Sequence, residues 1–174
     1  ALAILEAHTG LEDLTGPRAG LLADIYDGLV SIYAQCGIYP DALDFMHKQL
    51  AAAERSGDRR RLANAKNNLA HGLRELDEPA RATATLLETL ALAEEIGHVR
   101  AECLALLNLA LMHQVAGTAD QALAFARQGL DRCRAAGFEQ FTVHAYEILG
   151  SSHLQAGDVP AALHCLEQAL ADAQ

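Results

Sequence analysis

The chain has 174 residues, of which 51% are hydrophobic and only 5% aromatic, and its formal net charge at pH 7 is −10. Alanine and leucine supply most of the apolar fraction, a composition that suits packed helices better than a sheet. The only basic run is residues 59–61, so the basic stripe of a nucleic-acid surface is missing. No apolar run approaches ~18 residues, so we expect no membrane-spanning segment.

Residues 1–8 (ALAILEAH) predict the tail of a second helix from a preceding repeat. Because the chain starts without methionine on apolar helical sequence, we interpret it as a fragment of a longer protein. The following residues, up to 16, predict an irregular connection, so that 1–16 precede the main array at 17–174. Within that array we expect eight helices, at about 18–36, 40–56, 59–76, 79–96, 99–116, 119–136, 139–156 and 159–173.

Local signals support these boundaries. Asp58 is a candidate N-cap, because its side chain can accept hydrogen bonds from the first backbone amides of a helix. Glycines suit the left-handed position that ends a helix, and prolines suit the first helical turn. The glycines are Gly57, Gly97 and Gly137, and the prolines are Pro17, Pro40, Pro79 and Pro160.

The helices form a repeat with a period of 40 residues. A turn residue recurs, with alanine five positions after it, leucine thirteen positions after it and leucine eight positions before it. Such fixed-period self-similarity indicates stacked helix pairs that bury their apolar faces against their neighbours. The repeats span about 18–57, 58–97, 98–137 and 138–174, and the turn residues are Gly37, Asp77, Gly117 and Gly157.

The fourth repeat reads Tyr146-x-x-Leu149-Gly150-x-x-His153 and then Ala162-x-x-x-Leu166. This pattern resembles the tetratricopeptide repeat (TPR). The first repeat matches it as well, through Tyr26, Leu29, Val30, Tyr33, Ala42 and Met46.

The departures from the family pattern are a period of 40 instead of about 34, a missing closing proline, Lys66 at the aromatic site, and histidine for tyrosine at His113 and His153. Longer repeats of this kind resemble those of kinesin light chains, LGN-type polarity scaffolds and bacterial maltose-regulator-like sensors. The resemblance implies an all-α fold, a right-handed α-solenoid of about four TPR-like helix-turn-helix repeats.

The resemblance also implies that the first helices of successive repeats line a concave groove that binds a peptide or protein. Asn68 and Asn108 occupy the same groove position one repeat apart, and a carboxamide has both a donor and an acceptor for an extended peptide backbone. The alternative is that each is a tolerated polar surface residue. The groove residues implied in this way are Asn64, Asn67, Asn68, His71, Leu104, Leu107, Asn108, Leu111, His144, Glu147 and Ser151.

An apolar strip at Leu104, Leu107, Leu111 and Val115 would not remain exposed to solvent in a soluble protein. We expect it to receive an apolar peptide, an amphipathic helix, another subunit or a neighbouring domain, the alternative being that repeats two and four bury it. Capture of a C-terminal carboxylate is not expected, because the first repeat offers Asp24 and Asp27 and no lysine occurs at the groove positions.

Catalysis, a cofactor and a bound metal are not expected, since the sequence has no nucleophile, phosphate-loop or zinc-ligand motif. The four cysteines are far apart and indicate reduced thiols of a cytoplasmic protein. The leading hypothesis is a non-catalytic protein–protein interaction scaffold, the sensor or regulatory part of a larger bacterial protein, with no nucleic-acid or membrane partner.

Two alternatives stay open. One is a small-molecule or signal-peptide sensing domain that controls an attached output domain. The other is a structural module that forms homodimers through uncapped ends or through the apolar groove. The last helix has apolar residues Leu166, Ala169 and Leu170 that no following repeat in this sequence covers, which predicts either more repeats in the full protein or self-association at this end.

Overall fold

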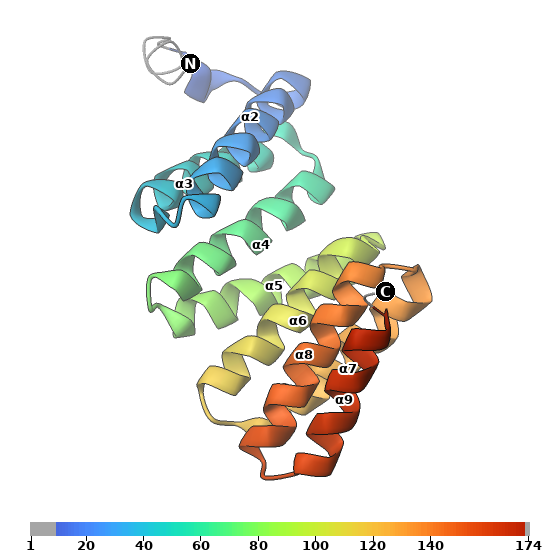
Figure 1. Ribbon diagram of the computed structural model, residues 1–174. Coiled ribbons are helices and arrows are strands. Elements are labelled where there is room, and N and C mark those ends of the chain that lie inside the picture. Colours follow the sequence, from blue (N-terminus) through green and yellow to red (C-terminus); the bar gives the residue numbers. More distant parts are fainter. Residues whose placement is uncertain (1–9, 173–174) are drawn as a thin grey trace. The chain divides into compact units, whose positions relative to one another are not determined.

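The computed structural model describes residues 10–172, and this part of the chain is helical without strands (Figure 1). The prediction for residues 1–8 lies outside the described residues. A short 3₁₀ helix, η1 (Leu11–Asp13), occupies the connection that was predicted to be irregular. The α-helices are α2 (Gly16–Gln35), α3 (Tyr39–Ser56), α4 (Arg59–Glu75), α5 (Pro79–Ile96), α6 (Val99–Val115), α7 (Ala119–Ala136), α8 (Glu139–Gln155) and α9 (Val159–Asp172).

The same hydrogen-bonded motif ends six of these helices. In the turn after α4, the amide of Glu78 donates to the carbonyl of Leu73, and the amide of Asp77 donates to the carbonyl of Arg74. This pairing satisfies carbonyls that have no partner inside the helix, and it requires a left-handed residue at the turn. Glycine takes that position in the other turns, and Asp77 is the one non-glycine residue with positive φ in residues 10–172.

The starts of the helices are also as predicted. Asp58 accepts hydrogen bonds from the amides of Arg60 and Arg61, at 2.9 and 3.2 Å, and so caps α4. All four prolines lie within the first two residues of a helix, where the missing amide hydrogen costs nothing.

The chain forms two compact units, which are described separately. The first extends to Glu78 and contains α2, α3 and α4, with α3 packed against both other helices. Alanines make up most of its core and allow the helices to approach closely. The buried members are Leu22, Ala23, Ala52, Ala53 and Ala65, and Leu11, Leu14, Tyr26, Leu50 and Leu62 pack against them.

The second unit begins at Pro79 and contains α5 to α9, each packed against the next along the chain. Its main core lies around α6, α7 and α8. At the edge of this core, Arg132 on α7 forms a bidentate ion pair with Glu102 on α6. The core includes Cys103, Leu107, Ala110, Ala126, Leu130, Cys133, Ala145, Tyr146, Ile148 and Leu149.

The alanine column of the repeat is buried in every copy, with Ala42, Ala82, Ala122 and Ala162 all at most 1% exposed. The leucine thirteen positions after the turn is buried or half-buried in the first three repeats, but Leu170 in the last repeat is 66% exposed. Leu166 is also exposed, as predicted for the last helix, whereas Ala169 is buried. No helix within residues 10–172 combines the length and apolar character needed to cross a membrane.

Candidate partner-binding face

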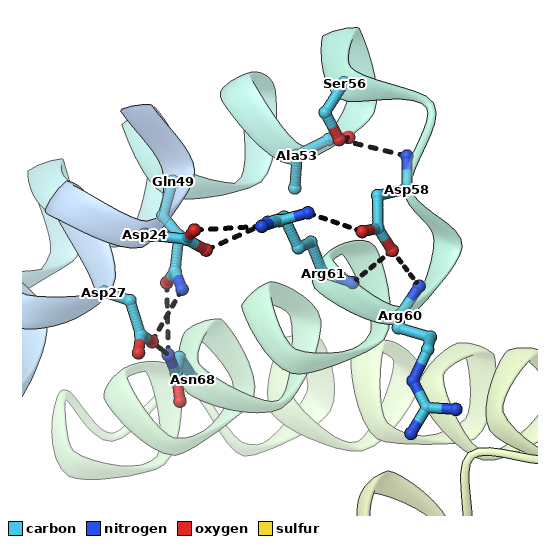
Figure 2. Close-up of polar contacts among 9 residues, drawn as sticks. All are labelled: Asp24, Asp27, Gln49, Ala53, Ser56, Asp58, Arg60, Arg61 and Asn68. Carbon is cyan, nitrogen blue, oxygen red and sulfur yellow. Dashed lines mark hydrogen bonds and ion pairs between the residues drawn. The ribbon is translucent and has the colours of Figure 1, made fainter. Parts of the chain in front are cut away.

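Polar side chains from three helices meet on one face of the first unit (Figure 2). Asp24 and Asp27 are three residues apart on α2 and therefore project from the same side of that helix. Arg61 and Asn68, two turns apart on α4, contact these two carboxylates. Gln49 reaches the same place from α3 and is only 4% exposed. We call Asp27, Gln49 and Asn68 the amide–carboxylate cluster.

Within this cluster, one oxygen of Asp27 is held from two sides. The Nε2 amide of Gln49 donates to Oδ1 of Asp27 at 2.8 Å, and the Nδ2 amide of Asn68 donates to the same oxygen at 2.7 Å. Asn68 also donates to Oε1 of Gln49, at 3.1 Å. Because Gln49 is buried, these bonds orient both of its partners, the exposed Asp27 and the half-buried Asn68.

The hydrogen bonds decide which groups the cluster can offer to a partner. A carboxamide has two donors, and both donors of Asn68 are directed to Asp27 and Gln49. Oδ1 of Asn68 and Oδ2 of Asp27 accept no hydrogen bond within the described residues, and Figure 2 shows these oxygens pointing away from the shared contacts. The cluster therefore presents acceptors and no donor.

Asp24 differs from Asp27 in having a cationic partner. Arg61 donates through Nε and Nη2 to the two oxygens of Asp24, at 2.9 and 3.0 Å, and through Nη1 to Asp58 at 2.6 Å. Partial burial raises the pKa of Asp58, but the backbone amides of Arg61 and Arg60 and the Arg61 guanidinium outweigh it and lower the pKa overall. Asp24 and Asp58 are thus compensated by Arg61, whereas Asp27 is held by neutral amides.

A small hollow of about 50 Å³ opens beside the cluster. Its lining includes Asp24, Asp27, Gln49, Arg61 and Asn64, so its walls are mostly polar. A volume of this size can hold one water molecule or the tip of a side chain.

The predicted groove residues of the first unit are placed as follows. Asn68 belongs to the amide–carboxylate cluster, and Asn64 is exposed beside the hollow. Asn67 is 5% exposed and is part of the packing rather than of the surface. His71 is half-buried, with its ring centroid 5.7 Å from that of Tyr39. Burial lowers the pKa of His71, and the nearby Arg74 guanidinium lowers it further.

In the second unit the predicted apolar strip is not a continuous surface. Leu107 is 2% exposed and lies in the core, where α7 approaches it so closely that a Cβ added at Gly129 would be 2.7 Å from its Cδ2 atom. We therefore assign Leu107 to packing rather than to partner binding. Leu104 and Leu111 are half-buried, and Val115 is 76% exposed.

The remaining predicted residues of the second unit are polar. Asn108 is half-buried on α6. His144 and Glu147 are exposed one turn apart on α8, with Nδ1 and Oε2 3.2 Å apart. Ser151 accepts a hydrogen bond from Gln114 and bonds to the carbonyls of α8.

Gln49 is the residue that the sequence analysis missed. It lies twelve positions after the turn residue, and the equivalent residues in the other repeats are Thr89, Gly129 and Ala169. All four positions are buried, so a long polar side chain at this point in one repeat needs hydrogen-bond partners. A glutamine at a position where the other repeats have small residues is the signal in the sequence that could have identified Gln49.

Within residues 10–172, no group of three or more histidine, cysteine, aspartate or glutamate side chains is arranged to hold a metal ion. Two larger hollows, of about 340 and 390 Å³, flank the turn between α7 and α8 and share Gly137 and Glu139.

Solved structures with the same fold are found for this chain. One is the crystal structure of BtubC (BKLC) from P. vanneervenii, which is 22% identical, with a TM-score of 0.76 over 88% of this chain and 64% of BtubC. The chain thus spans less than two thirds of BtubC. Another is a crystal structure of a protein from Podosopora anserina, described as a kinesin light chain with nearly identical TPR-like repeats. It is 15% identical, with a TM-score of 0.71 over 94% of this chain and 76% of the other.

No protein-family model matches the sequence, and no curated protein matches it. The structural likeness shows the all-helical, TPR-like repeat fold.

Proposed function

We propose that the chain is a non-catalytic protein-interaction module, and that the face formed by α2, α3 and α4 binds a segment of a partner protein. TPR-like repeats typically mediate protein–protein interaction. The observation that supports this face is the carboxylate of Asp27, which is exposed at one oxygen and held at the other by Gln49 and Asn68.

The partner segment carries a lysine or arginine side chain at this point. Oδ2 of Asp27 and Oδ1 of Asn68 are both acceptors, so they match an ammonium or guanidinium group, which has donors only. An extended backbone, which needs a donor and an acceptor from each carboxamide, fits Asn68 less well because its donors are already used. The net charge of −10 also favours a basic partner.

The wider context is part of the same proposal. We infer a cytoplasmic protein, in keeping with four cysteines that all carry free thiols. We infer further that the module is the sensor or regulatory part of a larger bacterial protein. The small-molecule alternative has less support, since the larger hollows lie at an exposed turn.

The side-chain amides of Asn68 and Gln49 provide a direct test. ¹⁵N-labelled protein is titrated with N-acetyl-arginine amide and, separately, with N-acetyl-citrulline amide, which has nearly the same shape without the charge. We expect saturable shifts of both amides with the arginine compound and affinity about tenfold lower for the citrulline compound, the loss expected for a charge-assisted hydrogen bond.

Two variants that each remove one negative charge show whether the arginine compound binds at Asp27. In Asp27→Asn the new amide oxygen can still accept from Gln49 and Asn68, but the charge is lost, so affinity for the arginine compound falls by about tenfold. Asp44→Asn removes a charge on α3 that is paired with Lys48, and affinity stays within about twofold. Equal binding of the arginine compound by wild type and Asp27→Asn would contradict the proposal.

Self-association is a second candidate, supported by α9. Val159, Leu163, Leu166 and Leu170 are each at least 43% exposed on this helix. An apolar surface of this kind favours a second copy of the chain as its cover. Sedimentation at several concentrations tests it: wild type should dimerise and Leu163→Gln/Leu170→Gln should stay monomeric, and a monomeric wild type would exclude this candidate.

A further inference from the structure

A hollow of about 260 Å³ lies between η1, α2 and α3 in the first unit, and it opens to solvent on one side. It shares no lining residue with the smaller hollow beside the amide–carboxylate cluster. Its lining consists of Leu11, Leu22, Tyr26, Lys48, Ala51 and Arg55.

The apolar part of this lining continues the core of the first unit. Leu22 is only 3% exposed, and Leu11 packs against the same core from η1. The polar residues lie nearer the opening, since Tyr26, Lys48 and Arg55 are all half-buried. A ligand that enters the hollow therefore meets polar groups at the rim and an apolar surface beneath them.

Of the two cations at the rim, only Lys48 is paired with an acid, at 2.6 Å between its Nζ and Oδ2 of Asp44. Arg55 instead donates through Nε to the neutral carbonyl of Leu14, at 3.1 Å. Arg55 has no ion-pair partner within residues 10–172, and Nη1 and Nη2 make no hydrogen bond there. A half-buried charge without a counter-charge is unfavourable, so an anion that reaches these donors is stabilised.

Tyr26 brings a second polar group to the same hollow. Its ring lies near that of Phe45, with 6.3 Å between the centroids. Its hydroxyl forms no hydrogen bond with any residue that the structure describes. The hydroxyl can therefore donate to a ligand that Arg55 also contacts.

We propose that this hollow binds a small carboxylic acid with an apolar body, in its ionised form, as a second ligand of the first unit beside the partner segment. A carboxylate accepts two parallel hydrogen bonds from a guanidinium, and Tyr26 can add a third. The body of the acid packs on Leu11, Leu22 and Ala51.

Charge and volume limit the class of ligand further. One arginine without a counter-charge matches a single negative charge better than a chain of phosphates. The volume is just below the usual range for ligand pockets, about 300–1,000 Å³, and suits a compact molecule.

The full chain, labelled with ¹⁵N and with ¹³C in its leucine methyl groups, is titrated with octanoate and followed by NMR. We expect saturable shifts of the Leu11 and Leu22 methyls and of the Arg55 Nε–H group, with nuclear Overhauser contacts from the octanoate chain to both methyls. Octanamide, which has the same body without the charge, should bind about tenfold more weakly. Acetate, which has the charge without the body, should bind more weakly still.

Three outcomes of this titration would overturn the proposal. Equal affinity for octanamide would remove the role of the charge, and equal affinity for acetate would reduce the site to a general attraction of anions. Octanoate binding that leaves the Leu11 and Leu22 methyls unshifted would place the acid elsewhere.

Two variants test the two halves of the site separately. Arg55→Gln removes the charge and Ala51→Leu fills the hollow while the charge stays, and each should weaken octanoate binding by about tenfold. Arg127→Gln, which removes an exposed charge on α7 in the second unit, should leave the affinity within about twofold. The methyl spectrum of each variant shows whether it is folded. Unchanged octanoate affinity in a folded Arg55→Gln or Ala51→Leu protein would contradict the assignment.

Discussion

At the residue scale, the amide–carboxylate cluster shows how one buried side chain determines what its neighbours can do. Asn68 alone would offer two donors and one acceptor to a partner. Gln49, buried beneath it, takes one donor and directs the other to Asp27. The groups that this surface offers to a partner are therefore determined by a residue that is itself only 4% exposed.

Asp77 occupies a backbone conformation that glycine takes in the equivalent turns, with φ of 60°. Because a side chain is disfavoured there, we expect Asp77→Gly to raise the free energy of unfolding by roughly 0.5–1 kcal/mol. The reverse change at the next turn, Gly117→Asp, should lower it by a similar amount. Urea unfolding of the three proteins checks this, and a loss of stability in Asp77→Gly would refute the explanation.

His71 should make stability depend on pH in a predictable direction. Its pKa in the folded chain is lowered mainly by burial, so between the ordinary value near 6.5 and the lowered value the unfolded chain binds more protons. The contribution of His71 is complete above pH 6.5 and is lost as the pH falls below it.

His71→Gln, which has no titrating group at this position, isolates the effect. Between pH 7 and pH 5, the unfolding free energy should fall more in wild type than in the variant. Thermal or urea unfolding at both pH values measures the difference. An identical fall in the two proteins would show that the histidine titrates normally.

The sequence alone pointed to some of the polar residues of this face, but neither to Gln49 nor to the roles of the others. The repeat positions placed three of these residues at the groove: Asn68, Asp24 and Asp27. Whether the donors of Asn68 point outward or toward Gln49 depends on a contact between α3 and α4, and sequence spacing does not contain that information. The same holds for Leu107, since its burial depends on the approach of α7 at Gly129.

At the element scale, α6 and α7 are held by packing and by the ion pair between Glu102 and Arg132. The alanine and glycine positions of the repeat allow the two helices to come close, and the larger side chains fill the remaining space. Leu107 is one of these fillers.

Truncation of leucines on α6 separates packing from partner binding. Leu107→Ala should lower the free energy of unfolding by about 2–5 kcal/mol, because it leaves a cavity in a well-packed core. Leu111→Ala should cost clearly less, since Leu111 is half-buried. Urea unfolding measures both, and a larger loss for Leu111→Ala would mean that the assignment of Leu107 to the core is mistaken.

The helices themselves were predictable to within about two residues at each end. The reason is that each boundary is marked locally, by a left-handed glycine or by a proline in the first turn. Asp77 shows that the rest of the motif is sufficient where glycine is missing, since Glu78 still bonds to Leu73. The helix η1 lacks such a repeat-based signal.

At the scale of the whole molecule, the repeated pattern determines the fold class, and the solved structures with 15–22% identity share it. Sequences this different can have the same fold because small residues are needed at only a few contact positions, such as the alanine column. The repeat pattern places no such requirement on the exposed side chains. The partner is therefore not determined by the repeat pattern, and its chemistry has to come from the exposed side chains.

The central claim is that the first unit selects a partner segment by a basic side chain at Asp27. Selection of a random peptide library displayed on phage, carried out in parallel on wild type and on Asp27→Asn, tests it without assuming the partner. We predict that wild type enriches peptides with lysine or arginine at one fixed position and that Asp27→Asn does not. Equal enrichment of basic residues by both proteins, or a wild-type consensus without them, would contradict it.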